Sequence, residues 1–149
     1  VRRPPRSGAV TCPDHPLVVV AAVIVQRERL LVVSKQAAPD VFYLPGGKPE
    51  PGEQPLEALT RELAEELGVS PLEPRLLGDV EAPAALEGVP MRMTVFHARI
   101  DRTPQPAAEL ARLKWITGHE PGLHLAPAVR HHVLPALRHR GLIGTPEAN

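Results

Sequence analysis

The sequence predicts a single mixed α/β domain, with several strands, one helix embedded among them and a second helix near the end. The chain has 149 residues, enough for one domain with its own core but too few for two. Residues 17–25 and 30–35 are apolar and rich in β-branched side chains, which is typical of buried strands. Residues 55–67 repeat leucine at three- and four-residue steps, as an amphipathic helix does.

The first elements follow directly from these patterns. Residues 17–25 and 30–35 are expected to pair as a hairpin, because a polar stretch separates them. Residues 41–44 form a third short strand. In the helix 55–67, proline occupies a first-turn position and Gly68 follows the last leucine, so both ends carry recognised signals.

The second half of the chain is expected to hold further strands and a final helix. Val129, Val133 and Leu137 give that helix one apolar face, and Pro135 is expected to kink it. The strands are expected at residues 75–82, 91–100 and 109–117, and the helix from about residue 125 to 140.

Composition limits the range of functions. Residues 1–16 are predicted to be a flexible N-terminal arm, residues 17–142 a single domain and residues 143–149 a tail. The formal charge of +0 argues against a stable nucleic-acid partner. A single cysteine excludes a disulfide within the monomer and favours a cytoplasmic location. We expect no membrane partner, because no apolar run reaches the roughly 20 residues that span a bilayer.

The helix 55–67 also carries a cluster of acidic side chains. Glu62 and Glu66 are one turn apart, with Glu65 beside them, and this stripe is predicted to point away from the leucines. Converging carboxylates are ligands for Mg²⁺ or Mn²⁺, and Mg²⁺ usually completes its shell with waters and substrate phosphates. The cluster therefore indicates phosphate chemistry.

The loop before the helix supports a ligand site. Gly46 and Gly47 allow the backbone to approach a ligand or metal closely. Arg61 can neutralise a carboxylate, either Glu65 by helical spacing or Glu53 if the loop folds back.

The spacing of these residues resembles a complete Nudix box. The order is Gly47, five residues, Glu53, seven residues, Arg61-Glu62-Leu63, one residue, Glu65-Glu66, one residue and Gly68-Val69. The order of strands around the box is similar to the Nudix-type α/β/α sandwich with a mixed β-sheet. The resemblance covers nearly the whole chain from about Leu17.

This resemblance implies hydrolysis of a nucleoside diphosphate linked to another moiety, with Mg²⁺ or Mn²⁺ as cofactor. Glu62 and Glu66 would be the main metal ligands, Glu65 a further ligand and the Gly46 carbonyl a backbone ligand. In such a site the metal neutralises diphosphate oxygens and lowers the pKa of a bound water, which then attacks phosphorus.

The remaining site residues would orient the site or act as the general base. The resemblance implies that Glu53 and Arg61 orient the site. Members of the family use either a box glutamate or one from a later loop as general base. Glu109, just before the last predicted strand, is the loop candidate, and Glu62 is the box candidate.

Substrate identity depends on residues outside the box. Lys35 is a candidate phosphate contact, Tyr43 can stack against a base, and Gly47 brings backbone near the ligand, although each residue type also has ordinary structural uses. The leading substrate is a nucleoside triphosphate or modified nucleotide, cleaved to monophosphate and pyrophosphate. The alternatives are ADP-ribose or a nucleotide sugar, and a non-catalytic nucleotide-binding regulatory module. A homodimer is among the oligomeric states left open.

Overall fold

A computed structural model describes residues 17–86 and 88–143. The predicted arm 1–16 and residues 144–149 of the predicted tail therefore lie outside the described residues. The elements are β1 (Leu17–Val23), β2 (Val25–Gln26), β3 (Arg29–Lys35), β4 (Ala38–Tyr43), β5 (Gly46–Gly47), α1 (Pro55–Leu67), β6 (Pro71–Pro83), β7 (Pro90–Ile100), β8 (Leu110–Ile116), the π-helical segment η1 (Val129–Val133) and α2 (Leu134–His139).

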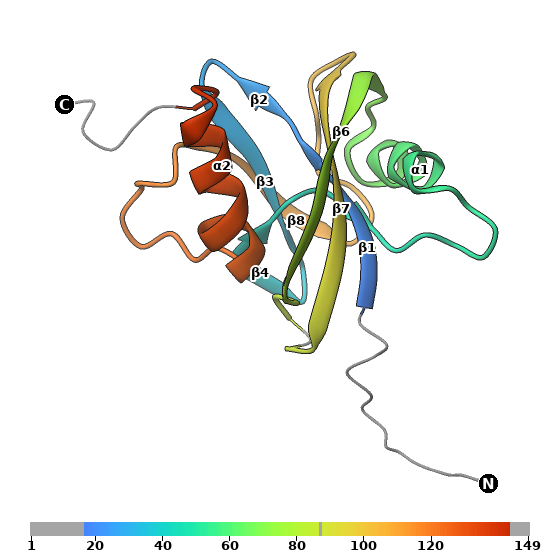
Figure 1. Cartoon of the computed structure of the whole chain (residues 1–149), viewed down its shortest axis with the longest axis horizontal. Helices are drawn as coiled ribbons and strands as arrows, with labels where there is room; N and C mark the ends of the chain where they lie inside the picture. Colours follow the sequence, from blue (N-terminus) through green and yellow to red (C-terminus); the bar gives the residue numbers. More distant parts are fainter. Residues whose placement is uncertain (1–16, 87, 144–149) are drawn as a thin grey trace, which may run out of the picture.

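The strands form two sheets between two helical layers. One sheet has the order β5-β1-β7-β6, and the other has the order β2-β3-β4 with β8 also paired to β3. Figure 1 shows α1 and α2 on opposite sides of these strands. The first sheet is mixed, because β1 pairs parallel with β7 and antiparallel with β5, whereas all strand pairs of the second sheet are antiparallel. The predicted α/β/α sandwich with a mixed sheet is confirmed.

Alternate residues of β1 build two separate cores. Val20 and Ala22 pack in the cluster that contains Leu59 and Leu63 of α1. Ala21 and Val23 pack in the cluster that contains the apolar side chains of η1 and α2. Because successive side chains of a strand point to opposite faces, a strand with a helix on each side must be apolar at every position. This requirement explains the unbroken apolar run in the sequence.

The predicted hairpin between residues 17–25 and 30–35 is wrong in its first half. β1 ends at Val23 and pairs with β5 and β7 of one sheet, whereas β2 pairs with β3 of the other. The chain passes between the sheets at Ile24, whose carbonyl accepts a hydrogen bond from the Leu31 N–H at 2.9 Å. Since both sheets are buried there, the apolar run carries no sign of the change of partner.

The turn between β2 and β3 holds strain that a substitution can remove. Arg27 and Glu28 have φ angles of 54° and 64°, between the paired residues Gln26 and Arg29. A two-residue hairpin with both central φ angles positive favours Asn-Gly, whereas other side chains in this region cost about 1 kcal/mol each. We expect the double variant Arg27→Asn, Glu28→Gly to raise the free energy of unfolding by about 1 kcal/mol in urea titrations. Unchanged or lower stability would contradict this geometry.

The other strands are longer or shifted relative to the expectation. β4 begins at Ala38 rather than at residue 41, and β6 begins at Pro71 rather than at residue 75. Both additional stretches contain proline, which lowers strand propensity but is tolerated where a strand lies at a sheet edge. β6 is the last strand of its sheet order, so its prolines meet this condition.

The helix predicted over 125–140 begins later and is not uniform. Leu125 forms an isolated bridge with Phe42, and η1 begins at Val129. The Leu134 N–H donates a hydrogen bond to the Val129 carbonyl, which is the pairing of a π-helix. Pro135 lies in the first turn of α2. Proline lacks an N–H and crowds the preceding turn, so the irregular segment comes immediately before it.

The helix α1 has the predicted bounds, Pro55–Leu67. The Gln54 N–H donates a hydrogen bond to Glu57 Oε1 at 2.9 Å, which satisfies a backbone donor at the N-terminus of the helix. Gly68 ends the helix with a φ of 69°, in the left-handed region that favours glycine. Within residues 17–86 and 88–143, no helix is long and apolar enough to cross a membrane.

Candidate active site

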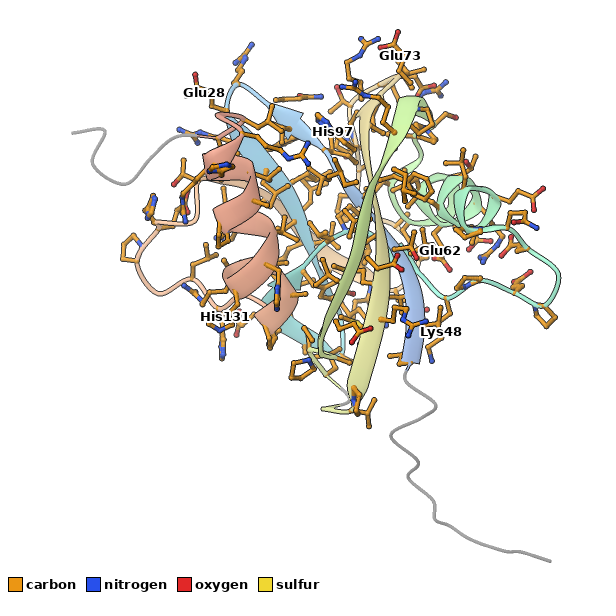
Figure 2. All side chains as sticks on the ribbon, in the orientation of Figure 1. Glu28, Lys48, Glu62, Glu73, His97 and His131 are labelled. Atoms are coloured by element: carbon orange, nitrogen blue, oxygen red, sulfur yellow. The ribbon has the colours of Figure 1, made fainter. Side chains whose placement is uncertain are left out.

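A cavity of about 310 Å³ opens between α1, β1, β7 and the segment that leads into η1. The candidate residues Lys35, Tyr43, Gly46, Gly47, Glu62, Glu66 and Glu109 all line it. Figure 2 shows Glu62 and Lys48 on the α1 side of the molecule, beside β1, whereas His131 projects from the α2 side. The structure therefore brings candidate residues from β3, β4, β5, α1 and the loop before β8 to one cavity.

Strand pairing places the glycines of β5 against the acidic helix. Gly46 and Gly47 pair with Ala21 and Val20 of β1, which holds the loop beside α1. A Cβ atom at Gly47 would overlap the Glu62 carboxylate, and one at Gly46 would overlap the Val20 carbonyl. Gly46 also has a φ of 150° and would meet backbone atoms, so its position requires glycine, whereas a side chain at Gly47 would displace the Glu62 carboxylate. The backbone and the Glu62 carboxylate can meet at this point only without a side chain.

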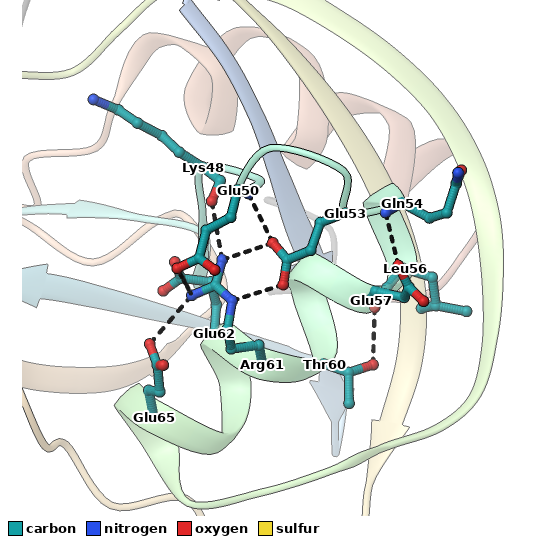
Figure 3. A network of polar contacts seen from close by, with 10 residues as sticks. All are labelled: Lys48, Glu50, Glu53, Gln54, Leu56, Glu57, Thr60, Arg61, Glu62 and Glu65. Atoms are coloured by element: carbon teal, nitrogen blue, oxygen red, sulfur yellow. Dashed lines mark hydrogen bonds and ion pairs between the residues drawn. The ribbon is translucent and has the colours of Figure 1, made fainter.

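Arg61 is the counter-charge for the acidic loop (Figure 3). Its Nε and Nη2 donate to Oε2 and Oε1 of Glu53 at 2.8 and 3.0 Å, a bidentate pair. These bonds hold the pKa of Glu53 down at about 2 and raise the pKa of Arg61. Of the two partners that the sequence left open, Glu53 is the closer one.

The same guanidinium fixes the loop relative to the helix. Its Nη2 donates to the Lys48 carbonyl at 3.1 Å, and its Nη1 donates to Glu62 Oε2 at 3.2 Å. The Glu50 N–H in turn donates to Glu53 Oε1 at 2.8 Å. Arg61 thus touches the loop backbone, the loop carboxylate and a cavity carboxylate at once.

Glu66 is the most perturbed acid in the cavity. Its exposed fraction is 7%, and it lines the cavity beside Glu62 while the leucines of α1 pack in a separate core cluster. Burial, followed by the nearby Glu62 and Glu109 carboxylates, raises the pKa of Glu66 to about 8. A buried carboxylate beside other acids is a place where a cation would relieve repulsion.

Glu65 lies apart from this group. Its side chain is exposed, and Arg61 Nη1 lies 3.3 Å from its Oε1. It does not line the cavity. The structure therefore separates Glu65 from Glu62 and Glu66, and its role as a further metal ligand stays a prediction.

Glu109 reaches the cavity from the loop before β8. The Lys35 Nζ lies 3.8 Å from its Oε1. Backbone bonds fix the loop on both sides, because the Ala107 N–H donates to the Glu66 carbonyl at 2.8 Å and the Gln36 N–H to the Glu109 carbonyl at 2.9 Å. The candidate loop base is therefore anchored both to the helix that carries Glu66 and to the end of β3.

The aromatic candidates divide between cavity and core. Tyr43 lines the cavity, while its hydroxyl is buried. Phe42 is buried in the core on the α2 side, and Phe96 and Trp115 pack against the core on the α1 side. Met91 and Met93 also line the cavity but were not identified from the sequence. Their position depends on the parallel pairing of β7 with β1, which no local pattern reports.

The cavity offers oxygen donors of the kind that a divalent cation binds. Among the described residues, no group of three His, Cys, Asp or Glu side chains is already arranged to hold a metal. The cavity does bring together Glu62, Glu66 and the backbone of Gly46. Mg²⁺ commonly takes one or two carboxylates and keeps several waters, so this all-oxygen set fits a hard cation that substrate phosphates complete.

Known proteins resemble this chain in sequence and in fold. The profile of the NUDIX domain matches residues 15–137. An ADP-ribose pyrophosphatase of Methanocaldococcus jannaschii is 38% identical over 71 residues, which cover 46% of this chain and 42% of the relative. Human diphosphoinositol polyphosphate phosphohydrolase 2 is 45% identical over 56 residues, which cover 38% of this chain and 31% of the relative. These alignments span less than half the length of either relative.

A solved structure agrees with them. The crystal structure of a MutT NUDIX hydrolase from Burkholderia pseudomallei superimposes with a TM-score of 0.67 at 29% identity, covering 78% of this chain and 94% of that chain. Because the profile match extends over most of the chain, the protein belongs to the NUDIX domain family. The resemblance that rested on the box spacing is confirmed.

Proposed function

We propose that this protein is a Nudix pyrophosphohydrolase that uses Mg²⁺ or Mn²⁺ to hydrolyse a nucleoside diphosphate linked to another moiety. The leading substrate is a nucleoside triphosphate or modified nucleotide, with monophosphate and pyrophosphate as products. The observation that carries this proposal is the meeting of Glu62, Glu66 and Glu109 at the wall of one cavity, with Lys35 beside them. Family membership supports the same reaction class.

Each residue has a defined task in this mechanism. Glu62 and Glu66, with the Gly46 backbone, would hold the cation, which screens the diphosphate charge and acidifies a bound water. Arg61 keeps Glu62 and the Glu53 loop in place through its bonds to both. Lys35 and Tyr43 line the cavity, where Lys35 would contact a substrate phosphate and Tyr43 the organic part of the substrate. Glu109 would accept the proton of the attacking water.

A second substrate class has its own support. The archaeal relative is named an ADP-ribose pyrophosphatase, and its alignment of 71 residues favours ADP-ribose or a nucleotide sugar as the alternative. Both alternatives contain the same diphosphate link and differ in the group beyond it. The regulatory-module alternative predicts nucleotide binding without turnover. A homodimer and a cytoplasmic location also remain predictions.

The test of this proposal is the dependence of activity and stability on the metal. We expect phosphate or pyrophosphate release from a panel of nucleotides and nucleotide sugars in Mg²⁺, and none in excess chelator. Because the cation binds the folded state, Mg²⁺ should also raise Tm, by an amount that grows with its concentration. Turnover that continues unchanged in chelator would overturn the metal mechanism, and binding without turnover would favour the regulatory module.

A further inference from the structure

A second hollow, of about 130 Å³, lies between α2 and the strands β6 and β7. Most of its lining is apolar, and Leu77 and Val95 form part of it. It shares no described lining residue with the catalytic cavity, which uses earlier parts of β1 and β7. Figure 2 shows His97, two residues after Val95 on β7, well away from Glu62 and Lys48 of that cavity. The titratable residues in the lining of the hollow are Asp79, His132 and Arg140.

Cationic side chains lie at the rim of this hollow. Arg140, at the end of α2, lines the hollow itself, whereas Arg75 and His97 line an open groove of about 500 Å³ on the same two strands. Arg75 pairs in register with His97, so both side chains lie on one face of the sheet. Burial, followed by the charges of Arg75 and Arg140, lowers the pKa of the half-buried His97. The charged neighbours that act on His97 are therefore both cations.

These cations have no protein counter-charge in the part of the chain that the structure describes. Neither Arg75 nor Arg140 takes part there in an ion pair or a side-chain hydrogen bond. The helix dipole favours a cation at the end of α2, which accounts for Arg140, but it does not account for Arg75 on a strand. Because like charges at one site repel, an anion bound between them would remove an unfavourable interaction.

The two acids of β6 nearest to Arg75 in sequence are engaged elsewhere. Glu73 Oε1 accepts a bond from Arg99 Nη2 at 2.7 Å, and Asp79 Oδ1 accepts one from Thr94 Oγ1 at 3.0 Å. Thr94 pairs in register with Asp79 and precedes Val95, whose side chain packs in the core on the α2 side. Since successive side chains of a strand point to opposite faces, the Asp79 carboxylate faces away from the hollow. The site therefore presents cations at its rim and apolar side chains inside.

We propose that Arg75, His97 and Arg140, together with the apolar hollow beside α2, form a second binding site for a small organic anion. The ligand class is one phosphate or carboxylate group on a compact apolar or aromatic body. Guanidinium groups bind both kinds of anion. An apolar cavity of about 150 Å³ can hold a benzene ring, so a hollow of about 130 Å³ suits a body of that size. This inference goes beyond the proposed function, because the site is separate from the catalytic cavity and needs no metal.

The test measures binding to the metal-free full chain by NMR of the histidine rings, with phenyl phosphate and benzoate as probes. In chelator, no metal neutralises the acids of the catalytic cavity, which disfavours anions there. We expect both probes to bind with a Kd below about 1 mM. They should also raise the pKa of His97, because a nearby anion favours the charged imidazolium. His97→Gln assigns the signals of His97, and those of His131, which lines neither hollow, should not move.

Inorganic phosphate and benzyl alcohol test the two halves of the site separately. We expect each to bind at least about tenfold more weakly than phenyl phosphate, equal to 1.4 kcal/mol, because each lacks one set of contacts. Equal affinity for inorganic phosphate would overturn the proposal, since the hollow would then contribute nothing. Signals of His97 that stay fixed at about 10 mM phenyl phosphate would also overturn it. Neither outcome affects the proposed reaction, which is assayed separately as turnover in Mg²⁺.

Variants locate the bound anion. Arg75→Gln and Arg140→Gln should each weaken the binding of phenyl phosphate by about threefold or more. Ala136→Leu, at an exposed position of the lining, should fill the hollow and weaken phenyl phosphate but not inorganic phosphate. Arg92→Gln is the matched control, because Arg92 is an exposed arginine of β7 that lies 3.5 Å from Glu81 and lines neither hollow. Unchanged affinity in both Arg75→Gln and Arg140→Gln would place the ligand elsewhere and contradict the proposal.

Discussion

Replacing Glu66 with glutamine is expected to lower kcat by more than about a hundredfold at saturating Mg²⁺, while the protein remains folded. Loss of an outer-shell partner alone commonly reduces metal affinity or activity by about 10–100-fold, and a direct ligand should matter more. Glutamine keeps the shape of the side chain but removes the charge that faces Glu62 and Glu109. Steady-state assays over a range of Mg²⁺ concentrations measure the effect.

The matched control lies one turn earlier on the helix. Leu63 is fully buried against the same core, so Leu63→Ala should cost about 2–5 kcal/mol of unfolding free energy and retain turnover wherever the protein is folded. Glu66→Gln should instead keep or raise the Tm of the metal-free protein, because repulsion is removed. Near wild-type turnover in Glu66→Gln would remove this residue from the metal site.

The raised pKa of Glu66 adds a pH signature to the same prediction. Since its folded pKa is about 8, above the ordinary value of 4.5, the folded protein binds this proton more tightly than the unfolded chain. Metal-free stability should therefore fall as pH rises from about 4.5 to 8, and Glu66→Gln should flatten this slope. Mg²⁺ competes with the proton, so the increase in Tm on adding Mg²⁺ should be larger at pH 8 than at pH 6.

Elements whose sequence signals lie within a few neighbouring residues were predicted correctly, whereas pairings between distant strands were not. The helix α1 was predicted with both ends correct, because leucine spacing, a first-turn proline and Gly68 all act within a few residues. The pairing of β1 with β7 was not predicted, because it joins residues that are far apart in the chain. A strand buried on both faces lacks the alternation that would mark its register.

The site shows the same division. Spacing along one helix placed Glu62 near Glu66 and Arg61 near Glu65, and the structure has both arrangements. The closer contact of Arg61 with Glu53 was the alternative that required the loop to fold back. Helical spacing did not predict that Glu66 would be buried and Glu65 exposed, because that depends on how α1 rests on the sheet. The position of Met91 and Met93 in the cavity was missed for a similar reason. It depends on the pairing of β7 with β1, two strands that are far apart in the sequence.

Replacing Glu109 with glutamine is expected to lower single-turnover hydrolysis by about 10²–10⁴-fold, the usual contribution of a general base, with little change in Mg²⁺ affinity. The backbone bonds of its loop to Glu66 and to Gln36 persist in the variant, so the position of the side chain is retained. Rapid-quench measurements at saturating Mg²⁺ give the rate of the chemical step.

Glu81→Gln is the matched control, because Glu81 is also an exposed carboxylate paired with a cation, 3.5 Å from Arg92, but lies outside the cavity. Exposed pairs of this kind contribute about 0–1 kcal/mol, so breaking the Lys35 pair alone cannot explain a large loss of rate in Glu109→Gln. If the loss is smaller than about tenfold, equal to 1.4 kcal/mol, Glu109 is not the base. The role then passes to Glu62, which lines the same cavity and is held by Arg61.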